Sequence, residues 1–466
     1  MLFTFLPLPL LALTESMSEI ESAGEIVQNL SSFQFSFTAG ILSFSLLILV
    51  SILFEKLGIK LGIPGSIFLF FVGLFSHISG FSFESFPLEE LHAVALCILL
   101  FFSGLSFDRS LLRENKVLTN SINLALFGTL ISMLFWSLYL LVGFSFFQGM
   151  FGYLDGIKSE FIDLIVVTVV FSIAVQDWNT FMFVSKRIKD FRSVLSNIFK
   201  IETAISASIS AAVAQILVLI WLAIHPEFIV YNEWQLFLSI SRGLLVGSLA
   251  GFALGFLLTL TIRHAVTSKP QLVLCAVAFT QIGYVISFSI TGLGGYLCAL
   301  VMGIVTSLTY RKSSTEDEIE FLVEELETLN IASEAILFFA IGLGLEATSF
   351  IAHLPVAIYV WIGIIIIRPI TVNLFFRSSA AKPEERRLLS FWSPKGAISM
   401  ALAVTAPELL KETFGMQISG IFPESASSFS ADVVCGAVLF SMIVKSFAIP
   451  KLHSRLIGSP SNNQEL

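Results

Sequence analysis

Apolar runs of about 20 residues dominate the sequence and recur from residue 41 almost to the C-terminus. A run of this length crosses the hydrocarbon core of a bilayer as a helix. Only 13% of the residues are charged, whereas soluble domains carry roughly a quarter. The chain is therefore predicted to be an all-α, polytopic membrane protein. An ordinary cytosolic enzyme and a disordered chain are both excluded.

About thirteen transmembrane helices are predicted from these runs. We expect them at residues 34–54, 63–80, 90–107, 118–147, 161–184, 194–223, 235–262, 270–290, 293–309, 331–349, 355–376, 387–406 and 429–449. Residues 1–33 are expected to form an N-terminal extracytoplasmic or signal-like segment. Residues 34–450 then form one transmembrane domain, and residues 451–466 form a short cytoplasmic tail. The loops leave no room for a separate soluble domain.

Lysine and arginine residues fall in alternate loops between the predicted spans. These loops carry Lys56, Lys60, Arg109, Arg113, Lys116, Lys186, Arg187, Lys189, Arg192, Arg263, Lys269, Arg311, Lys312, Arg377, Lys382, Arg386, Arg387, Lys451 and Arg455. The opposite loops carry only Lys158 and Lys411. Because basic loops stay in the cytoplasm, we predict an outer N-terminus, a cytoplasmic C-terminus and a location in the plasma or inner membrane.

One predicted cytoplasmic loop has a distinct composition. Residues 311–330 are expected to form a short acidic amphipathic helix. Its apolar face comprises Ile319, Leu322, Val323 and Leu326. A solvated connector is the simpler interpretation, and a contact with a regulatory partner is the alternative.

Several other classes of function are disfavoured. A net charge of -8 argues against nucleic acid as a partner. The four cysteines lie inside apolar runs without metal-ligand spacing, so neither a zinc site nor a disulfide framework is expected. No loop carries a nucleophile or an acid/base pair, and no cofactor is predicted. Gly251 and Gly255 lie within a predicted span, where close helix packing is their expected role.

Two predicted spans contain residues that interrupt a helix. An odd number of spans fits two inverted repeats joined by a linking helix, and the fifth span then corresponds to the twelfth. The fifth contains SIAVQDWN at 172–179, and the twelfth contains WSPKGAIS at 392–399, where Pro394, Lys395 and Gly396 break the helix. Discontinuous helices at matching positions predict a transport site.

Asp177 is the main candidate for ion and proton binding. A charge within a membrane costs roughly 2.5 kcal/mol or more, and Asp177 has no cation within its own helical turn. A carboxyl group removed from water can hold either a proton or a small cation near neutral pH. Amide and hydroxyl oxygens would complete the shell of a hard cation, and Gln176, Asn179 and Ser206 are the candidates. Capping of an unwound backbone is the alternative role for Asp177.

The remaining intramembrane charges have structural interpretations. Glu202 and Arg368 are predicted to form a buried ion pair that locks two helices together. Arg242, Lys395 and Lys445 are expected to extend toward the membrane interface.

Five segments, in their order and spacing, resemble the monovalent cation:proton antiporter (sodium/proton exchanger) superfamily. They are LFEKLGIKLGIPGSIFLFFVGL at 53–74, LLFFSGLSFDRSLLR at 99–113, AILFFAIGLGLE at 335–346, IIRPITV at 366–372 and WSPKGAISMALA at 392–403. The resemblance covers roughly residues 35–450. It implies a thirteen-helix sodium/proton antiporter fold with a six-helix transport bundle and a dimerisation domain. It also implies a homodimer and elevator-like exchange of Na⁺, Li⁺ or K⁺ for H⁺.

The ion site departs from the pattern of this superfamily. The Thr-Asp-Pro segment of the fifth span reads Gln-Asp-Trp at 176–178. The Glu-Ser-x-x-Asn-Asp segment of the sixth span, whose last Asp is the principal ion ligand, reads Glu-Thr-Ala-Ile-Ser-Ala at 202–207. The resemblance pairs Glu202 with Arg368 and places Lys395 where the superfamily has arginine. The sequence therefore predicts a degenerate ion site.

Three hypotheses about this site stay open. Asp177 could be the sole exchanging carboxylate, which would make exchange electroneutral. Glu202 could be recruited, since it shares a helix face with Ser206. Transport could also be lost or changed. The last case includes a non-transporting scaffold or sensor, and a uniporter or organic-anion carrier on the same fold.

Overall fold

The computed structural model describes residues 49–78, 88–105, 115–151, 159–188, 195–203, 205–206, 210, 233–266, 268–291, 294–310, 316–376, 382–413 and 424–456. The chain divides into two compact units, residues 1–50 with 82–87 and residues 51–81 with 88–466. Only residues 49 and 50 of the first unit are described. The predicted N-terminal segment 1–33 lies outside the described residues.

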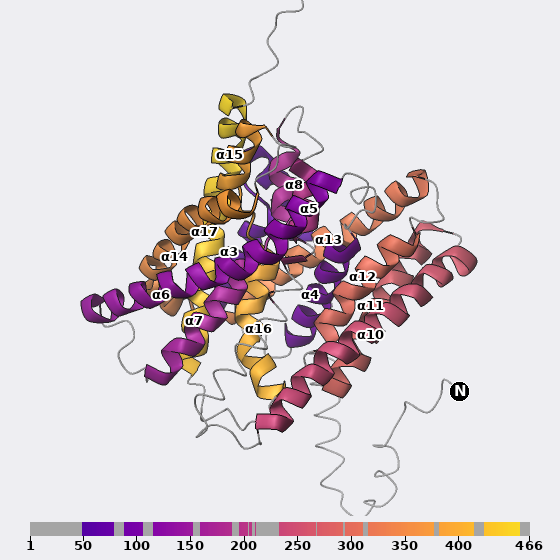
Figure 1. Ribbon diagram of the computed structural model, residues 1–466, viewed down its shortest axis with the longest axis horizontal. Coiled ribbons are helices and arrows are strands. Elements are labelled where there is room, and N and C mark those ends of the chain that lie inside the picture. The colour runs from indigo at the N-terminus through magenta and orange to yellow at the C-terminus, as the bar shows by residue number, and fades with distance from the viewer. Residues whose placement is uncertain are drawn as a thin grey trace, which may run out of the picture. The chain divides into compact units, whose positions relative to one another are not determined.

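Every regular element in these described ranges is a helix (Figure 1). The elements are α3 Ser66–Ile78, α4 Leu88–Leu105, α5 Asn115–Asn123, the π-helical turn η2 Leu124–Gly128, α6 Thr129–Phe151, α7 Ser159–Ala174, α8 Trp178–Ser185, α10 Glu233–Ala265, α11 Lys269–Thr291, α12 Gly294–Tyr310, α13 Glu316–Gly344, α14 Ala347–Phe375, α15 Pro383–Phe391, α16 Ala397–Thr413 and α17 Glu424–Leu456. Residues 49–61 and 195–203 are also helical. The all-α prediction is confirmed for this part of the chain.

Six of the described helices are long and apolar enough to cross a membrane. A seventh span results when α7 and α8, bent by 42° relative to one another, are counted together. Leu249, Phe252 and Phe256 of α10 are each more than half exposed, as expected for side chains that face lipid. The count of thirteen spans and the inverted repeats stay predictions.

One expected helix boundary was wrong. Residues 311–330 were expected to form a separate helix before the span at 331–349, but α13 runs without interruption from Glu316 to Gly344. No glycine or proline lies between 316 and 341 to end the helix. Leu326, on the predicted apolar face, is buried. The other side chains of that face lie outside the described residues.

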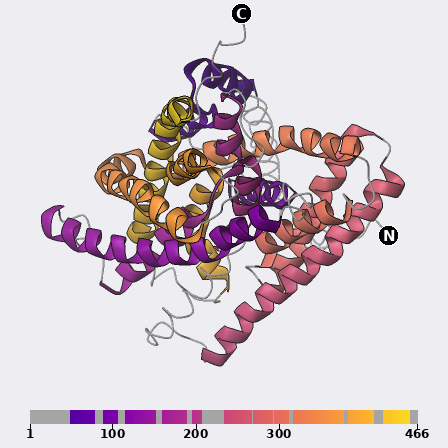
Figure 2. The ribbon, with the colours of Figure 1, turned by 45° about the horizontal axis from the view of Figure 1, so that its top comes forward.

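The helices pack as two bundles. The first contains α3, α4 and α10 to α13, and the second contains α5 to α8 and α14 to α17. In Figures 1 and 2, α10, α11 and α12 lie together, apart from α6, α14 and α17. The bundles meet where α16 contacts α4 and α13, and where α3 contacts α14.

The first bundle contains helices whose backbones approach closely. A Cβ atom on Gly251 of α10 would lie 2.6 Å from the carbonyl oxygen of Cys298 in α12. One turn further along, a Cβ on Gly255 would lie 2.8 Å from the carbonyl oxygen of Met302. Only glycine permits this separation, so the predicted packing role of both residues is confirmed.

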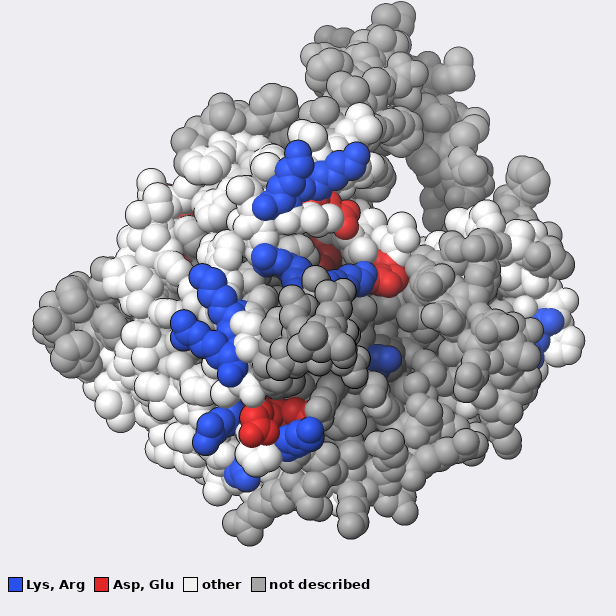
Figure 3. All heavy atoms as spheres, turned by 90° about the horizontal axis from the view of Figure 1, so that it is seen from above, with Lys and Arg blue, Asp and Glu red and all other residues white. Residues whose placement is uncertain are grey.

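Basic side chains gather on one face, at the end of the molecule where α8 and α15 lie (Figure 3). Just after the C-terminal end of α8, Arg187 donates hydrogen bonds to the carbonyl oxygens of Gly62, at 2.6 Å, and Ser446, at 3.0 Å. Lys186 forms an ion pair with Glu327 at 2.7 Å. Segments that the sequence assigns to the cytoplasmic side therefore meet at the same end of the helices.

Candidate functional site

Both interrupted helices predicted from the sequence are present. Residues 175–177 are non-helical between α7 and α8, and residues 392–396 are non-helical between α15 and α16. An interruption exposes backbone N–H and C=O groups that have no partner within their own helix. Inside a membrane these groups must find partners in the protein.

The two interruptions supply these partners to each other. The N–H of Asp177 donates to the carbonyl oxygen of Pro394 at 3.0 Å. Nζ of Lys395 donates to the carbonyl oxygen of Val175 at 2.8 Å, and the hydroxyl of Thr180 donates to the carbonyl oxygen of Lys395 at 3.0 Å. The fifth and twelfth predicted spans therefore meet at their breaks.

Asp177 lies at the centre of this meeting point and is only 1% exposed. It is the N-cap of α8, with extended backbone, and its Oδ2 accepts a hydrogen bond from the N–H of Thr180 at 2.8 Å. Gly396 packs against this carboxylate, because a Cβ at that position would overlap Oδ2 of Asp177. The sequence-based alternative, helix capping, is thus one of the contacts that Asp177 makes.

The other predicted ligands lie on different sides of Asp177. The N–H of Gln176 donates to the hydroxyl of Ser206 at 3.2 Å. When the Gln176 amide nitrogen faces the carbonyl oxygen of Pro394, its oxygen lies 3.2 Å from Nζ of Lys395. Asn179 instead accepts a hydrogen bond from Asn330 of α13. Gln176 and Ser206 are therefore brought together, whereas Asn179 points toward the first bundle. Residue 207 lies outside the described residues.

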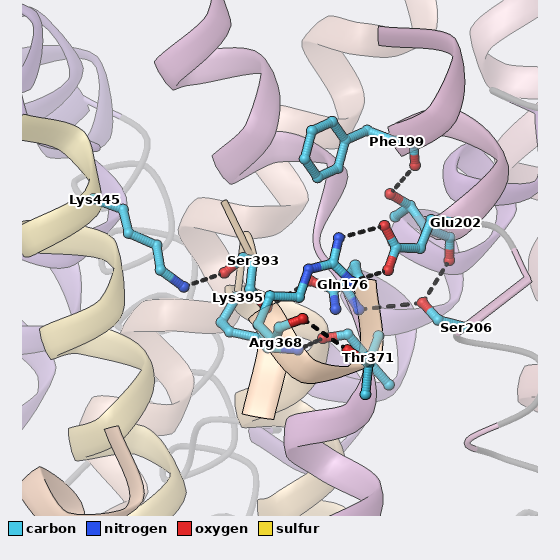
Figure 4. Close-up of polar contacts among 11 residues, drawn as sticks. Gln176, Phe199, Glu202, Ser206, Arg368, Thr371, Ser393, Lys395 and Lys445 are labelled. Carbon is cyan, nitrogen blue, oxygen red and sulfur yellow. Dashed lines mark hydrogen bonds and ion pairs between the residues drawn. The ribbon is translucent and has the colours of Figure 1, made fainter. Parts of the chain in front are cut away.

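Glu202 and Arg368 are brought together as a buried, bidentate ion pair. Nη2 of Arg368 donates to Oε2 of Glu202 at 2.7 Å, and Nη1 donates to Oε1 (Figure 4). A cavity of about 20 Å³ lies beside the pair and is also lined by Gln176, Ser393 and Lys395. Nε of Arg368 is buried and has no partner among the described residues. The cavity has room for about one water molecule.

The prediction that Lys395 and Lys445 extend to the interface was wrong, because both side chains are buried. Nζ of Lys445 donates to the carbonyl oxygen of Ser393 (Figure 4), as Lys395 does to that of Val175. The broken helices expose carbonyl oxygens that accept these bonds inside the protein. Arg242 is exposed on α10.

The family of the chain follows from comparison with known proteins. A family model described as "Sodium/hydrogen exchanger, transmembrane" matches residues 41–454. The chain belongs to the sodium/hydrogen exchanger family. The members of this family are transporters, so the chain is a multi-pass integral membrane protein. Membership of the family also supports cation:proton antiport. Among curated proteins, none matches the sequence significantly.

Solved structures of an antiporter share the fold of this exchanger-family chain. A structure of the sodium proton antiporter MjNhaP1 from Methanocaldococcus jannaschii at pH 8 superimposes with a TM-score of 0.68 and 18% identity. The alignment covers 91% of this chain and 100% of the antiporter. A second MjNhaP1 structure, from an electron-microscopy map, gives a TM-score of 0.67 at 18% identity, covering 91% of this chain and 98% of that one.

Two buried carboxylates inside the predicted spans of this exchanger-family chain were not identified from the sequence. Glu334 lies in α13, where it accepts a hydrogen bond from the hydroxyl of Ser66 at 3.1 Å. Asp432 lies in α17, where it accepts from the hydroxyl of Ser349 at 2.6 Å and pairs with His353 at 2.8 Å. Both are acidic residues within apolar runs, so the criterion that selected Asp177 would also have selected them.

Proposed function

We propose that the chain exchanges a monovalent cation, Na⁺, Li⁺ or K⁺, for protons across a membrane, with Asp177 as the exchanging carboxylate. The observation that carries this proposal is the burial of the Asp177 carboxyl group where two interrupted helices meet. Transporters of this general design place their ion sites at such interruptions. Family membership supports the same class of activity.

The local geometry supports an ion-exchanging role for Asp177. Its carboxylate is held in place by the N–H of Thr180 and by the lack of a side chain at Gly396. Carbonyl, amide and hydroxyl oxygens suit a small, hard cation. Gln176 and Ser206, which contact one another, are the proposed neutral ligands, whereas the amide oxygen of Asn179 accepts a hydrogen bond from Asn330 instead. Since one carboxylate holds either one proton or one monovalent cation, the site has the same charge in both states. Exchange is therefore electroneutral in this mechanism.

Glu202 has a structural role in this proposal. Arg368 binds both of its carboxylate oxygens, and releasing one partner of such a buried pair is costly. This arrangement favours Asp177 over Glu202 as the group that exchanges ions. Lys395 and Pro394 then keep the two helix interruptions together.

We also propose a homodimer in the plasma or inner membrane, with the N-terminus outside and the C-terminus in the cytoplasm. The gathering of basic side chains on one face supports this orientation. The dimer rests on the family resemblance, and chemical cross-linking of the chain in native membranes would test it.

Proton flux in sealed vesicles tests the proposed exchange. The purified chain is reconstituted, a pH gradient is imposed, and Na⁺, Li⁺ and K⁺ are added in turn while the internal pH is followed. We expect at least one cation to trigger proton flux in the wild type and none to do so in Asp177→Asn. Normal exchange by Asp177→Asn would overturn the proposed mechanism.

The same measurement separates the alternatives. A scaffold or sensor gives no cation-triggered flux in any arm. A uniporter or organic-anion carrier moves its substrate at a rate that does not depend on the proton gradient.

A further inference from the structure

A series of polar contacts links α8 of the second bundle to α13 of the first. At the outer end, Nζ of Lys186 lies 2.7 Å from Oε1 of Glu327. Further in, the side-chain amide of Asn330 donates to the amide oxygen of Asn179. At the inner end, Glu334 lies one helical turn beyond Asn330 on α13 and accepts a hydrogen bond from Ser66, while Asn179 is two residues along the chain from Asp177. We call this series the α8–α13 ladder.

Helical geometry explains why these residues form a series. Glu327, Asn330 and Glu334 follow one another at intervals of three and four residues, so they lie on one face of α13. Asn179 of α8 and Lys186, the C-cap of that helix, are seven residues apart, which also places them on one face. The residue numbers rise along α13 as they fall along α8, so the two faces run antiparallel.

The ladder runs from the surface into the core. The side chain of Lys186 is 59% exposed and that of Glu327 is 27% exposed. Asn330 is buried, Glu334 is 7% exposed, and Asp177 is 1% exposed. Lys186 at the outer end is the C-cap of α8, and α8 lies at the end of the molecule where basic side chains gather (Figures 1 and 3). The ladder therefore connects that face to the proposed exchange site.

The inner end of the ladder has the groups of a cation site. Glu334 supplies a carboxylate, Ser66 a hydroxyl oxygen 3.1 Å from it, and Asn179 and Asn330 supply amide groups. Within that part of the chain, no lysine, arginine or histidine forms an ion pair with Glu334. A buried carboxylate without a basic partner is costly unless a proton or a cation neutralises it.

We propose that Glu334, with Ser66, Asn179 and Asn330, forms a second site for a monovalent cation or a proton. This site lies next to Asp177, on the route from Asp177 to the outer end of the ladder. This inference rests on the proposed exchange at Asp177 and extends its route. A cation that binds Glu334 displaces one proton from its carboxyl group, and it displaces one proton from Asp177 when it moves inward. Glu334 then takes up a proton again, so one cation is exchanged for one proton overall.

The position of the second site between the bundles gives it a further role. Glu334 and Ser66 belong to the first bundle, whereas Asp177 and Asn179 belong to the second. A displacement of one bundle past the other would separate Glu334 from Asp177. The second site is therefore complete only in the arrangement of the two bundles that the structure shows.

Cation-triggered proton release from the purified chain in detergent tests this inference. NaCl, LiCl or KCl is added to weakly buffered protein with a pH-indicator dye, and choline chloride is the ionic-strength control. We expect Asp177→Asn to retain part of the wild-type release, and Asp177→Asn with Glu334→Gln to lose it. Glu346→Gln, at the exposed start of α14, is the matched carboxylate control and should behave as wild type.

Vesicle flux supplies a second readout. Glu334→Gln should raise the cation concentration for half-maximal flux by about tenfold, since the cation loses a charged ligand. Ser66→Ala, which keeps the carboxylate, should shift it less and in the same direction. If Glu334→Gln is not a monodisperse protein, the cation concentration for half-maximal flux in Ser66→Ala and Glu334→Asp tests the second site instead.

The outcomes separate this inference from the proposed function. One outcome would overturn the second site alone. In it, Asp177→Asn abolishes flux, but Glu334→Gln and Ser66→Ala keep the wild-type dependence of flux on cation concentration. Absence of wild-type flux, together with proton release that needs Glu334, would overturn the exchange mechanism and leave the second site standing. Equal proton release by Asp177→Asn and by the double variant would also refute the second site.

Discussion

Gly396 lies against the carboxylate of Asp177 so closely that no side chain fits between them. The contact joins the interruption at 392–396 to the one at 175–177. It also brings the hydroxyl of Thr180 within reach of the position where a Cβ would stand. The carboxylate therefore keeps its position at the cap of α8 partly because residue 396 has no side chain.

Replacing Gly396 with alanine should displace the Asp177 carboxylate. The added methyl group overlaps Oδ2, so the hydrogen bond from the N–H of Thr180 is lost or lengthened. We expect a loss of exchange of about tenfold or more, measured as cation-triggered proton flux in vesicles. Gly344→Ala is the matched control, because nothing lies within 4 Å of its added Cβ. Equal flux in both variants would contradict this prediction.

The capping and ion-exchanging roles of Asp177 can be separated by substitution. Asparagine caps helices nearly as well as aspartate, whereas alanine does not. Asp177→Asn should therefore keep the thermal midpoint close to wild type while abolishing exchange. Asp177→Ala should abolish exchange and also lose about 1 kcal/mol of stability. Thermal unfolding in detergent measures the difference, and a role in capping alone predicts that Asp177→Asn exchanges normally.

Breaking the Glu202–Arg368 pair should destabilise the chain. Each single neutral substitution, Glu202→Gln or Arg368→Gln, leaves one buried charge without its partner, at a cost of about 3–5 kcal/mol. The double variant removes both charges and should recover part of this loss. A double-mutant cycle on thermal midpoints measures the coupling. If the single losses simply add in the double variant, the pair has no coupling energy.

The interrupted helices could be predicted from sequence because local chemistry determines them. Pro394 lacks a backbone N–H, and glycine at 396 disfavours helix. Asp177 was recognisable because an isolated carboxylate in an apolar run is energetically costly and therefore indicates a functional role. These features need no knowledge of the three-dimensional arrangement.

Features that depend on distant partners could not be obtained in this way. Lys395 and Lys445 are buried because carbonyl oxygens of Val175 and Ser393 accept their hydrogen bonds. Those acceptors become free only when two helices break and meet. Likewise, Asn179 was assigned to the same ligand set as Gln176 from adjacency alone. The structure turns it toward Asn330.

Asp432 should stabilise the contact between α14 and α17 without taking part in exchange. Its Oδ2 accepts from Ser349 and pairs with His353, while Oδ1 has no partner among the described residues. Asp432→Ala removes an acceptor from two polar groups and should cost about 1–3 kcal/mol. Asp432→Asn keeps an oxygen acceptor and should cost less.

Two measurements check this last prediction. Thermal midpoints in detergent should fall in the order wild type, Asp432→Asn, Asp432→Ala. Cation-triggered flux per correctly inserted molecule should be the same in wild type and Asp432→Asn, because none of these contacts includes Asp177 or Glu334. If Asp432→Asn folds normally but no longer exchanges ions, Asp432 belongs to the transport route. The route of the ions past Glu334 and Asp177 would then extend through the second bundle to α14.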